Sequence, residues 1–379
     1  MAAGIRKVGS GNASERGPRA QVEGIVTDWT RRAFLRRIAA GLGLASGGWL
    51  LAACGAERMA SPTPSPNPTE VSRASAVPPA DPTPTATLKS MKSESGETRA
   101  PTVTPTAMRY PDLVVARNGE PAQLVRRAMA ALGGMERFVQ QGDDVVVKPN
   151  ICVAYHSYEY AATTNPWIVG EMVRLALEAG ARRVRVMDYP FGGSPEQAYA
   201  KSGIKEQVEK AGGQMEVMTG FKFLDTDIPD GVDLRTCKVY DGVLNADVVI
   251  NIPIAKHHSL ARLTLGMKNL MGTIYNRPQM HRNLGQRLAD LTSRVRPTLT
   301  VIDAVRMLMR NGPTGGSLDD VKQADTVIVS PDIVATDSYA ATLFELAPED
   351  LAYVRAGAEM GLGRSDLDSL KIEEIRVGG

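Results

Sequence analysis

Polar side chains that can carry charge or transfer a proton stand at the ends of several apolar runs. These side chains are Lys148, Asn150, Asp188, Lys256, His257, His258, Asp303, Ser330 and Asp332. A lysine that leaves a buried strand costs free energy unless an anion or an acid meets its ammonium group. Lys148, Lys256 and Lys268 each have an asparagine or a histidine within two residues. Their convergence on one sheet edge would form a pocket for a carboxylate or a phosphate.

The pocket hypothesis assigns roles to particular residues. We expect Lys148 and Lys256 to bind the anion and Lys268 and Asn269 to orient it, with Asn150 and Asp188 completing the ligand-binding set. The alternative is that the lysines form structural ion pairs with acids at neighbouring strand ends. These acids are Asp188, Asp303 and Asp332. The two interpretations can hold together.

Three of the four histidines lie near these lysines: His257, His258 and His281. With Asp303 or Asp188 they are candidates for a mixed imidazole and carboxylate site for a divalent metal. The set we assign is His257, His281 and Asp303, which would either hold the metal or transfer a proton in catalysis. Adjacent residues at a strand end point to opposite faces, so at most one of His257 and His258 is expected to face the cleft.

Cys152 follows Asn150 by two residues and is a candidate nucleophile with His156 as its base. A disulfide between Cys152 and Cys237 is the competing possibility in an oxidising compartment. The chain has three cysteines and no Cys-x-x-Cys, so it is not expected to hold an iron–sulfur cluster by itself.

Several glycines place backbone amides in loops, but none of these loops matches a phosphate-binding loop or a dinucleotide fingerprint. The glycine-rich run 311–316 follows an expected strand. We interpret it as a mobile rim over the pocket, and an ordinary turn-rich connection is the alternative.

Short β-branched runs alternate with helical segments from residue 113 onward, which predicts a mostly parallel sheet with helices on both faces. The expected strands are 113–116, 144–148, 183–188, 214–218, 247–254, 298–303, 326–330 and 371–377. The expected helices are 120–132, 166–179, 195–201, 284–294 and 333–344. Ligands of such sheets bind outside the carboxyl ends of the strands, where the polar residues above are expected.

Three segments carry a family resemblance: Val-Val-Val-Lys-Pro-Asn at 145–150, Asn-Ile-Pro-Ile-Ala-Lys-His-His at 251–258, and Thr-Leu-Gly-Met-Lys-Asn-Leu-Met-Gly at 264–272. Together they resemble the bacterial and archaeal family known as domain of unknown function 362, over roughly 113–344. Some members of that family carry ferredoxin-type cysteine runs. This chain lacks them, so the resemblance implies a fold more than a reaction.

The N-terminal segment 1–54 resembles an export signal. Arg31 and Arg32 precede a weakly apolar stretch of about 16 residues, which is too short for a permanent membrane span. The stretch ends in Leu-Ala-Ala-Cys54, which resembles a bacterial lipobox. We therefore expect export by the twin-arginine machinery, lipidation of Cys54 and anchoring at the outer face of a bacterial membrane.

Residues 55–108 are expected to form a disordered tether, because 61–107 hold ten of the 24 prolines and no aromatic residue. The remaining 109–379 are long enough for one α/β domain. Segment 1–54 contains eight of the 44 basic and three of the 42 acidic residues, so the rest of the chain is slightly acidic. That balance does not favour binding to nucleic acid.

The sequence therefore predicts a membrane-tethered protein outside the cytoplasm that acts on a small anionic molecule. Twin-arginine export and the iron–sulfur relatives make a redox enzyme with a cofactor or metal the first expectation. The alternatives are a solute-binding lipoprotein without catalysis and a scaffold with a degenerate site. Two lobes and a hinge would favour the first alternative, and dispersed, exposed lysines would favour the second.

Overall fold

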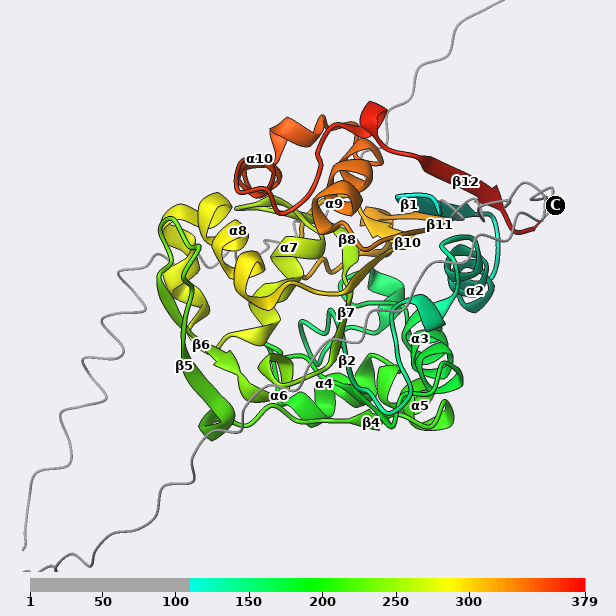
Figure 1. Cartoon of the computed structure of the whole chain (residues 1–379), viewed down its shortest axis with the longest axis horizontal. Helices are drawn as coiled ribbons and strands as arrows, with labels where there is room; N and C mark the ends of the chain where they lie inside the picture. Colours follow the sequence, from blue (N-terminus) through cyan, green and yellow to red (C-terminus); the bar gives the residue numbers. More distant parts are fainter. Residues whose placement is uncertain (1–109, 379) are drawn as a thin grey trace, which may run out of the picture. The chain divides into compact units, whose positions relative to one another are not determined.

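The computed structural model describes residues 110–378, and a ten-stranded mixed sheet runs through this part of the chain (Figure 1). The main path of the sheet has the order β12-β1-β11-β10-β7-β2-β3-β4, and β8 and β9 extend it beside β10. The strands on this path are β1 (Leu113–Arg117), β2 (Asp144–Pro149), β3 (Arg183–Val186), β4 (Gln214–Met215), β7 (Val248–Ile252), β10 (Leu299–Leu308), β11 (Val321–Ser330) and β12 (Ile372–Arg376).

Helices cover both faces of the sheet, as the sequence predicts. Within β1, Val114 and Ala116 enter one apolar core while Leu113 and Val115 enter another, because side chains alternate along a strand. The first core is closed by α2 (Pro121–Ala131), α3 (Pro166–Glu178), α4 (Pro195–Lys201) and α5 (Ile204–Lys210). The second is closed by α7 (Gly266–Asn269), α8 (Leu284–Val295), α9 (Ile333–Thr342) and α10 (Ala352–Glu359).

The parallel strands form the half of the sheet that holds the site. β10, β7, β2, β3 and β4 pair in parallel, whereas β11 is antiparallel to both β10 and β1. The mostly parallel α/β class is confirmed. The antiparallel β10–β11 hairpin was not expected, because the predicted strands 298–303 and 326–330 omit the second half of β10 and the polar first half of β11, which pair with each other.

Pro253 divides the predicted strand 247–254. β7 ends at Ile252, and the chain re-enters the sheet as β8 (Ile254–His258), which pairs with β10 and with β9 (Arg262–Thr264). Lys256, His257 and His258 therefore lie within a strand rather than after one. Their side chains alternate between the two faces of β8, which decides which of them reaches the site.

Several other elements are not predicted from the sequence. A two-stranded sheet of β5 (Phe223–Asp227) and β6 (Thr236–Tyr240) lies outside the main sheet, and β6 is followed by the short helix α6 (Asp241–Leu244). The predicted strand 214–218 is only the two-residue β4. Polar residues interrupt the apolar pattern in these segments, so periodicity alone does not reveal them.

The predicted export signal, Cys54 and the tether 55–108 lie outside the described residues. Within 110–378, the structure contains no helix with the length and apolarity that a bilayer span requires.

Candidate functional site

A cavity of about 420 Å³ opens at the carboxyl ends of β2 and β3, where a parallel sheet is expected to bind a ligand. β8 and α7 form further walls, and the 3-10 helix η5 (Arg277–Asn283) lies at its edge. The lining includes six residues that the sequence predicts as ligand-binding: Lys148, Asn150, Asp188, Lys256, Lys268 and Asn269.

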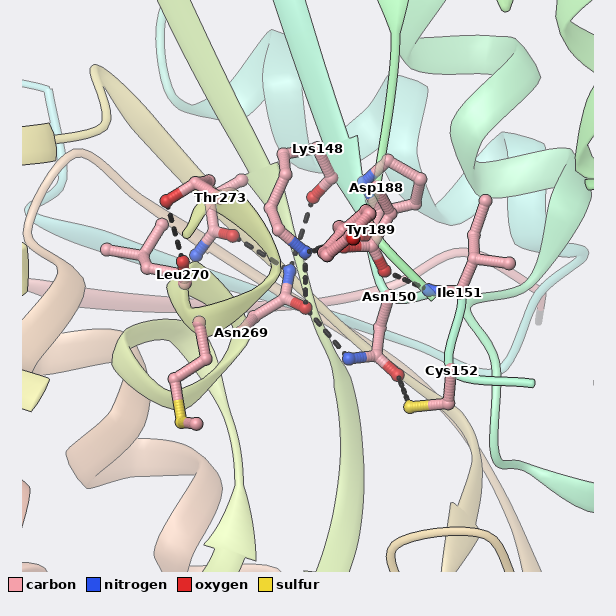
Figure 2. Close-up of polar contacts among 12 residues, drawn as sticks. Lys148, Asn150, Ile151, Cys152, Asp188, Tyr189, Asn269, Leu270 and Thr273 are labelled. Carbon is pink, nitrogen blue, oxygen red and sulfur yellow. Dashed lines mark hydrogen bonds and ion pairs between the residues drawn. The ribbon is translucent and has the colours of Figure 1, made fainter. Parts of the chain in front are cut away.

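Lys148 forms the centre of the polar network on the sheet side of the cavity (Figure 2). Its buried ammonium group donates to Asp188 Oδ1 at 2.7 Å, to Asn269 Oδ1 at 3.0 Å and to the Pro149 carbonyl at 2.9 Å. These three bonds use all three ammonium protons. Burial lowers the pKa of Lys148, and the Asp188 carboxylate opposes that shift. Lys148 and Asp188 therefore form the structural ion pair that was the alternative hypothesis.

Asn269 connects α7 to the sheet. Its Oδ1 accepts from Lys148 and from Asn150 Nδ2 at 2.8 Å, and its Nδ2 donates to Asn251 Oδ1 at 2.9 Å and to the Lys148 carbonyl. Its amide group is thus fully engaged with protein groups. Asn269 positions the lysine and leaves no free donor with which to orient a ligand.

Lys256 is fully buried and has no carboxylate partner among the described residues. Its ammonium group donates to Asn150 Oδ1 at 2.9 Å, to the Ala162 carbonyl at 2.7 Å and to Cys152 Sγ at 2.9 Å. The Cys152 thiol donates to Asn150 Oδ1 at 3.0 Å. Lys256 therefore contributes a positive charge to the cavity without a free proton for a direct bond.

Lys268 differs from Lys148 and Lys256 in how its ammonium group is bonded. It is half-buried on α7, lines the cavity, and has no hydrogen-bond or ion-pair partner for its ammonium group within 110–378. Burial lowers its pKa from 10.5 to about 8; Cys152 opposes this shift, and the positive charges of Lys256, Arg277 and Lys148 add to it. Of the three lysines that line the cavity, Lys268 is therefore the one whose ammonium group is available to a ligand.

His258 presents a neutral imidazole to the cavity. Its Nδ1 accepts from the backbone amides of Leu260 at 3.1 Å and Ala261 at 3.3 Å, which assigns the remaining proton to Nε2. Burial, followed by the charges of Lys268 and Lys256, lowers the pKa of His258 to about 3. The ring is therefore a neutral hydrogen-bond donor throughout the physiological pH range.

The predicted catalytic and metal set of His257, His281 and Asp303 is not brought together. His281 is exposed and lines the cavity, while His257 is not among the lining residues and its Nδ1 accepts from the Gly312 amide at 3.1 Å. Asp303 is buried, where it accepts from the amides of Asn165 and Val305. The described residues contain no group of three or more histidine, cysteine or acidic residues that could hold a metal ion.

The cysteine hypotheses also fail on geometry. Cys152 and Cys237 are free thiols, so the competing disulfide is absent. His156 stacks on Tyr160, with 4.7 Å between the ring centroids, whereas the partners of Cys152 are Asn150 and Lys256. The loop after β2 directs the sulfur into the cavity rather than toward that imidazole.

Four further lining residues are not in the ligand-binding set predicted from the sequence: His258, Thr264, Gly272 and Arg277. His258 was detectable, because it shares a strand face with Lys256 two residues earlier. Thr264 pairs with Lys256 across β8 and β9, and its buried Oγ1 has no hydrogen-bond partner within 110–378. Arg277 lies in a polar segment that no apolar pattern singles out.

Arg277 is held by backbone carbonyls rather than by an acid. Its Nε donates to the Met271 carbonyl at 2.9 Å and its Nη2 to the Tyr189 carbonyl. Its Nη1 makes no hydrogen bond to any described residue. The guanidinium group thus adds a permanent positive charge with free donors at the cavity.

Asp337 fixes the start of α7 from the neighbouring helix α9. Its carboxylate accepts from the amides of Gly266 at 2.6 Å and Met267 at 2.9 Å, and burial raises its pKa to about 7. Because α7 carries Lys268, Asp337 positions the site without lining it. The predicted rim 311–316 contributes Pro313 to the cavity lining.

Comparisons with known proteins relate this chain to a wider protein family. A family model described as "Domain of unknown function (DUF362)" matches residues 145–342, just over half of the 379 residues. Thylakoid-associated protein sll1697 of Synechocystis sp. is 27% identical over 247 residues, which cover 63% of this chain and 74% of that protein. The family match includes every cavity residue discussed above.

Two solved structures show a limited likeness. The lactate racemase apoprotein of Thermoanaerobacterium thermosaccharolyticum has a TM-score of 0.37 and 13% identity, covering 56% of this chain and 53% of that one. A structural-genomics structure of a Thermotoga maritima protein has a TM-score of 0.33 and 10% identity, with coverages of 64% and 60%. This chain spans less than two thirds of the length of each.

Proposed function

The chain belongs to the family described as domain of unknown function (DUF362), and we propose that its cavity binds a small anionic molecule. The observation that carries this proposal is the charge of the lining. Among the described residues that line the cavity, four are cationic and one, Asp188, is acidic. The cationic residues are Lys148, Lys256, Lys268 and Arg277.

This imbalance favours an anion because a cavity wall shields charges from water. Asp188 already neutralises Lys148 at 2.7 Å, which leaves three cations without a carboxylate partner within 110–378. Interactions between charges are stronger in such a partly buried site than in bulk water. A bound carboxylate or phosphate would offset the excess positive charge.

The groups available for direct bonds are fewer than the sequence predicts. Lys148 and Lys256 use all their protons within the protein, so they attract the anion through their charge alone. The free donors are the Lys268 ammonium group, Arg277 Nη1 and His258 Nε2–H. The unpaired hydroxyl of Thr264 adds one group that can donate or accept.

The rest of the lining is largely apolar, and the size of the cavity fits a small molecule. Met271 and Tyr189 form apolar wall, and the exposed side chains of Phe191 and Leu260 line the cavity as well. A volume of about 420 Å³ lies at the lower end of the range for small-molecule pockets.

The alternatives are less well supported. The lysines of a degenerate scaffold would be dispersed and exposed, yet Lys148 and Lys256 are buried beside one cavity. A two-lobed solute-binding lipoprotein would place its site between domains. In this protein the cavity lies at the strand ends of one continuous sheet within residues 110–378. We therefore favour a protein that acts on its ligand.

Calorimetric titration with oxalate and with inorganic phosphate, at constant ionic strength, tests the proposal. Wild-type protein should bind at least one of them, and Lys268→Met should weaken binding about tenfold or more, since a hydrogen bond to a charged group contributes about 1.5–3 kcal/mol. The melting temperature should change little, because Lys268 has no partner to lose. Lys205→Met, at an exposed site on α5, is the matched control.

Two results would count against anion binding. One is the absence of binding by wild-type protein, together with the absence of any co-purified anion in native mass spectrometry. The other is a large loss of thermal stability in Lys268→Met, which would identify Lys268 as a structural group instead.

The cellular location is a separate part of the proposal. Twin-arginine export and lipidation at Cys54 are supported by Arg31, Arg32 and the Leu-Ala-Ala-Cys sequence, and the name of the Synechocystis relative describes association with a membrane system. Cells fed a labelled fatty acid should incorporate it into wild-type protein. Cys54→Ala should abolish incorporation and release the protein from the membrane fraction, and unchanged labelling would refute the anchor.

A further inference from the structure

We propose that Lys268 is a nucleophilic amine that forms an imine with its ligand, and that the ligand is a small 2-oxo acid. This inference rests on the proposed anion site and adds to it a residue with a covalent role and a substrate class. It follows from a comparison of the three cavity lysines, which differ in how their amino groups are bonded.

Two of the three lysines cannot serve as nucleophiles. An ammonium group has three protons, and Lys148 donates them to Asp188, Asn269 and the Pro149 carbonyl. Lys256 donates its three protons to Asn150, Cys152 and the Ala162 carbonyl. Each nitrogen is thereby enclosed by three protein partners, so neither has a free position from which to approach a carbonyl group.

The third amino group, that of Lys268, meets the requirements of a nucleophile. It lines the cavity and has no partner within the described residues, so no bond must break before it reacts. The titratable and charged groups that line the same cavity are mostly cationic or neutral. They are Lys148, Cys152, Asp188, Lys256, His258, Arg277 and His281.

These surroundings favour the neutral amine. Burial and the positive charges of Lys256, Arg277 and Lys148 lower the pKa of Lys268 to about 8, against the opposing effect of Cys152. Lysines that form imines are activated in this way, by desolvation or by a neighbouring cation. At pH 7 about a tenth of Lys268 is therefore unprotonated, far more than of an exposed lysine with a pKa of about 10.4.

The ligand class follows from the groups beside the amine. A 2-oxo acid carries a carboxylate, which Arg277 can bind through Nη1, next to a carbonyl carbon that an amine attacks. His258 Nε2–H can donate to the carbonyl oxygen and remains neutral, as its depressed pKa requires. The cavity thus pairs an anion-binding group with a nucleophile and a neutral donor.

The reaction balances without an oxidant or a reductant. The Lys268 nitrogen forms a bond to the carbonyl carbon, and the carbonyl oxygen takes up the proton that the nitrogen releases. The carbinolamine then loses its hydroxyl group and a second nitrogen proton as water. One amine and one carbonyl group thereby give one imine and one water molecule.

Reductive trapping tests the inference directly. Purified protein is incubated with pyruvate or glyoxylate and sodium borohydride, and the modified peptide is identified by mass spectrometry. We expect one dominant adduct on Lys268, with at least about tenfold less labelling at Lys205 and Lys210, since both of these lysines are exposed and paired with a glutamate. Trapping should increase with pH, reach half of its maximum near pH 8 and level off about one pH unit above that.

Two variants and one competitor sharpen the test. Lys268→Arg keeps a positive charge but should lose trapping completely, with its fold checked by circular dichroism and melting temperature. Lys205→Arg should trap as wild type does. Oxalate has no reactive ketone or aldehyde, so it should protect Lys268 by occupying the anion site.

The outcomes separate this inference from the proposed function. If oxalate binds in calorimetry but no adduct forms at Lys268, the imine is refuted and anion binding stands. If neither occurs, both proposals fall. Labelling of Lys268 that oxalate does not reduce, although oxalate binds, would show that the anion site does not direct the reaction and would also overturn the inference.

Discussion

At the scale of single residues, Gly272 shows how closely the site is packed. A Cβ atom at this position would lie 1.9 Å from Asp188 Oδ1 and 2.5 Å from Lys148 Nζ. The Lys-Asn-Leu-Met-Gly segment therefore ends in glycine because the backbone lies against a buried ion pair. The constraint is one of space, since the backbone here does not adopt the left-handed conformation.

Gly272→Ala should destabilise the protein by about 3 kcal/mol, because overpacking a core costs about 1–3 kcal/mol and disruption of a buried ion pair about 3–5 kcal/mol. Urea unfolding followed by circular dichroism measures the change. Gly220→Ala is the matched control, because its added Cβ would meet nothing closer than 3.7 Å. Equal stabilities of the two variants would contradict the packing argument.

At the scale of elements, the short helix α7 depends on α9 for its position. A four-residue helix has little stability of its own, so its place is set by tertiary contacts. Asp337 accepts from the first two amides of α7, and Asn269 connects the same helix to β2 and β7. These contacts hold Lys268 at the cavity wall.

Asp337→Asn should lower the free energy of unfolding by about 1–3 kcal/mol, since the amide can accept only one of the two backbone bonds and leaves the other N–H unpaired. It should also weaken oxalate binding, because Lys268 would be less well positioned. Urea unfolding and calorimetry provide the two measurements.

Ser338→Ala is a suitable control on the same helix. The buried Oγ of Ser338 has no hydrogen-bond partner among the described residues, so its removal should leave oxalate affinity unchanged. If Asp337→Asn and Ser338→Ala bound oxalate equally well, Asp337 would have no role in positioning the site.

At the scale of the whole molecule, Asp303 links stability to pH. It connects β10 to the start of α3, and burial raises its pKa from 3.8 to about 6. Between these values the folded state binds more protons at this group than the unfolded state does. The free energy of unfolding therefore falls as the pH rises through this window, and the contribution is fully present only below about pH 4.

Comparison of wild type with Asp303→Asn isolates this effect. The stability of wild type minus that of the variant should be larger near pH 4 than near pH 6, because the asparagine does not titrate. Urea unfolding across this pH range measures the difference in the free energy of unfolding. The contributions of all other titratable groups are nearly the same in both proteins and therefore cancel in this difference. A difference that is constant or that increases with pH would contradict a raised pKa for Asp303.

The site also shows where reasoning from sequence succeeds and where it does not. Lys148, Lys256 and Lys268 were expected to share a cavity because polar residues end apolar runs, and the structure brings them together. Which lysine pairs with an acid and which remains free was open. That depends on neighbours distant in sequence, such as Asp188, 40 residues from Lys148, and Asn269, 121 residues from it.

The choice between His257 and His258 illustrates the same limit. Alternation along a strand correctly predicts that one of them faces the cavity. The assignment of His257 was wrong because β8 begins a new strand after Pro253, with Lys256 and His258 on the face toward the site. Register with β10 and β9 sets that face.

The α/β class, most of the parallel strands and the convergence of the lysines could be predicted from local patterns, because hydrophobic periodicity and strand ends are local properties. The sequence also carries the export and lipidation motifs around Cys54, which remain predictions. The antiparallel pairing of β11, the burial of Asp303 away from the cavity and the lack of a partner for Lys268 within 110–378 follow from the three-dimensional structure alone. These features depend on strand register and on contacts between distant segments, which local patterns do not encode.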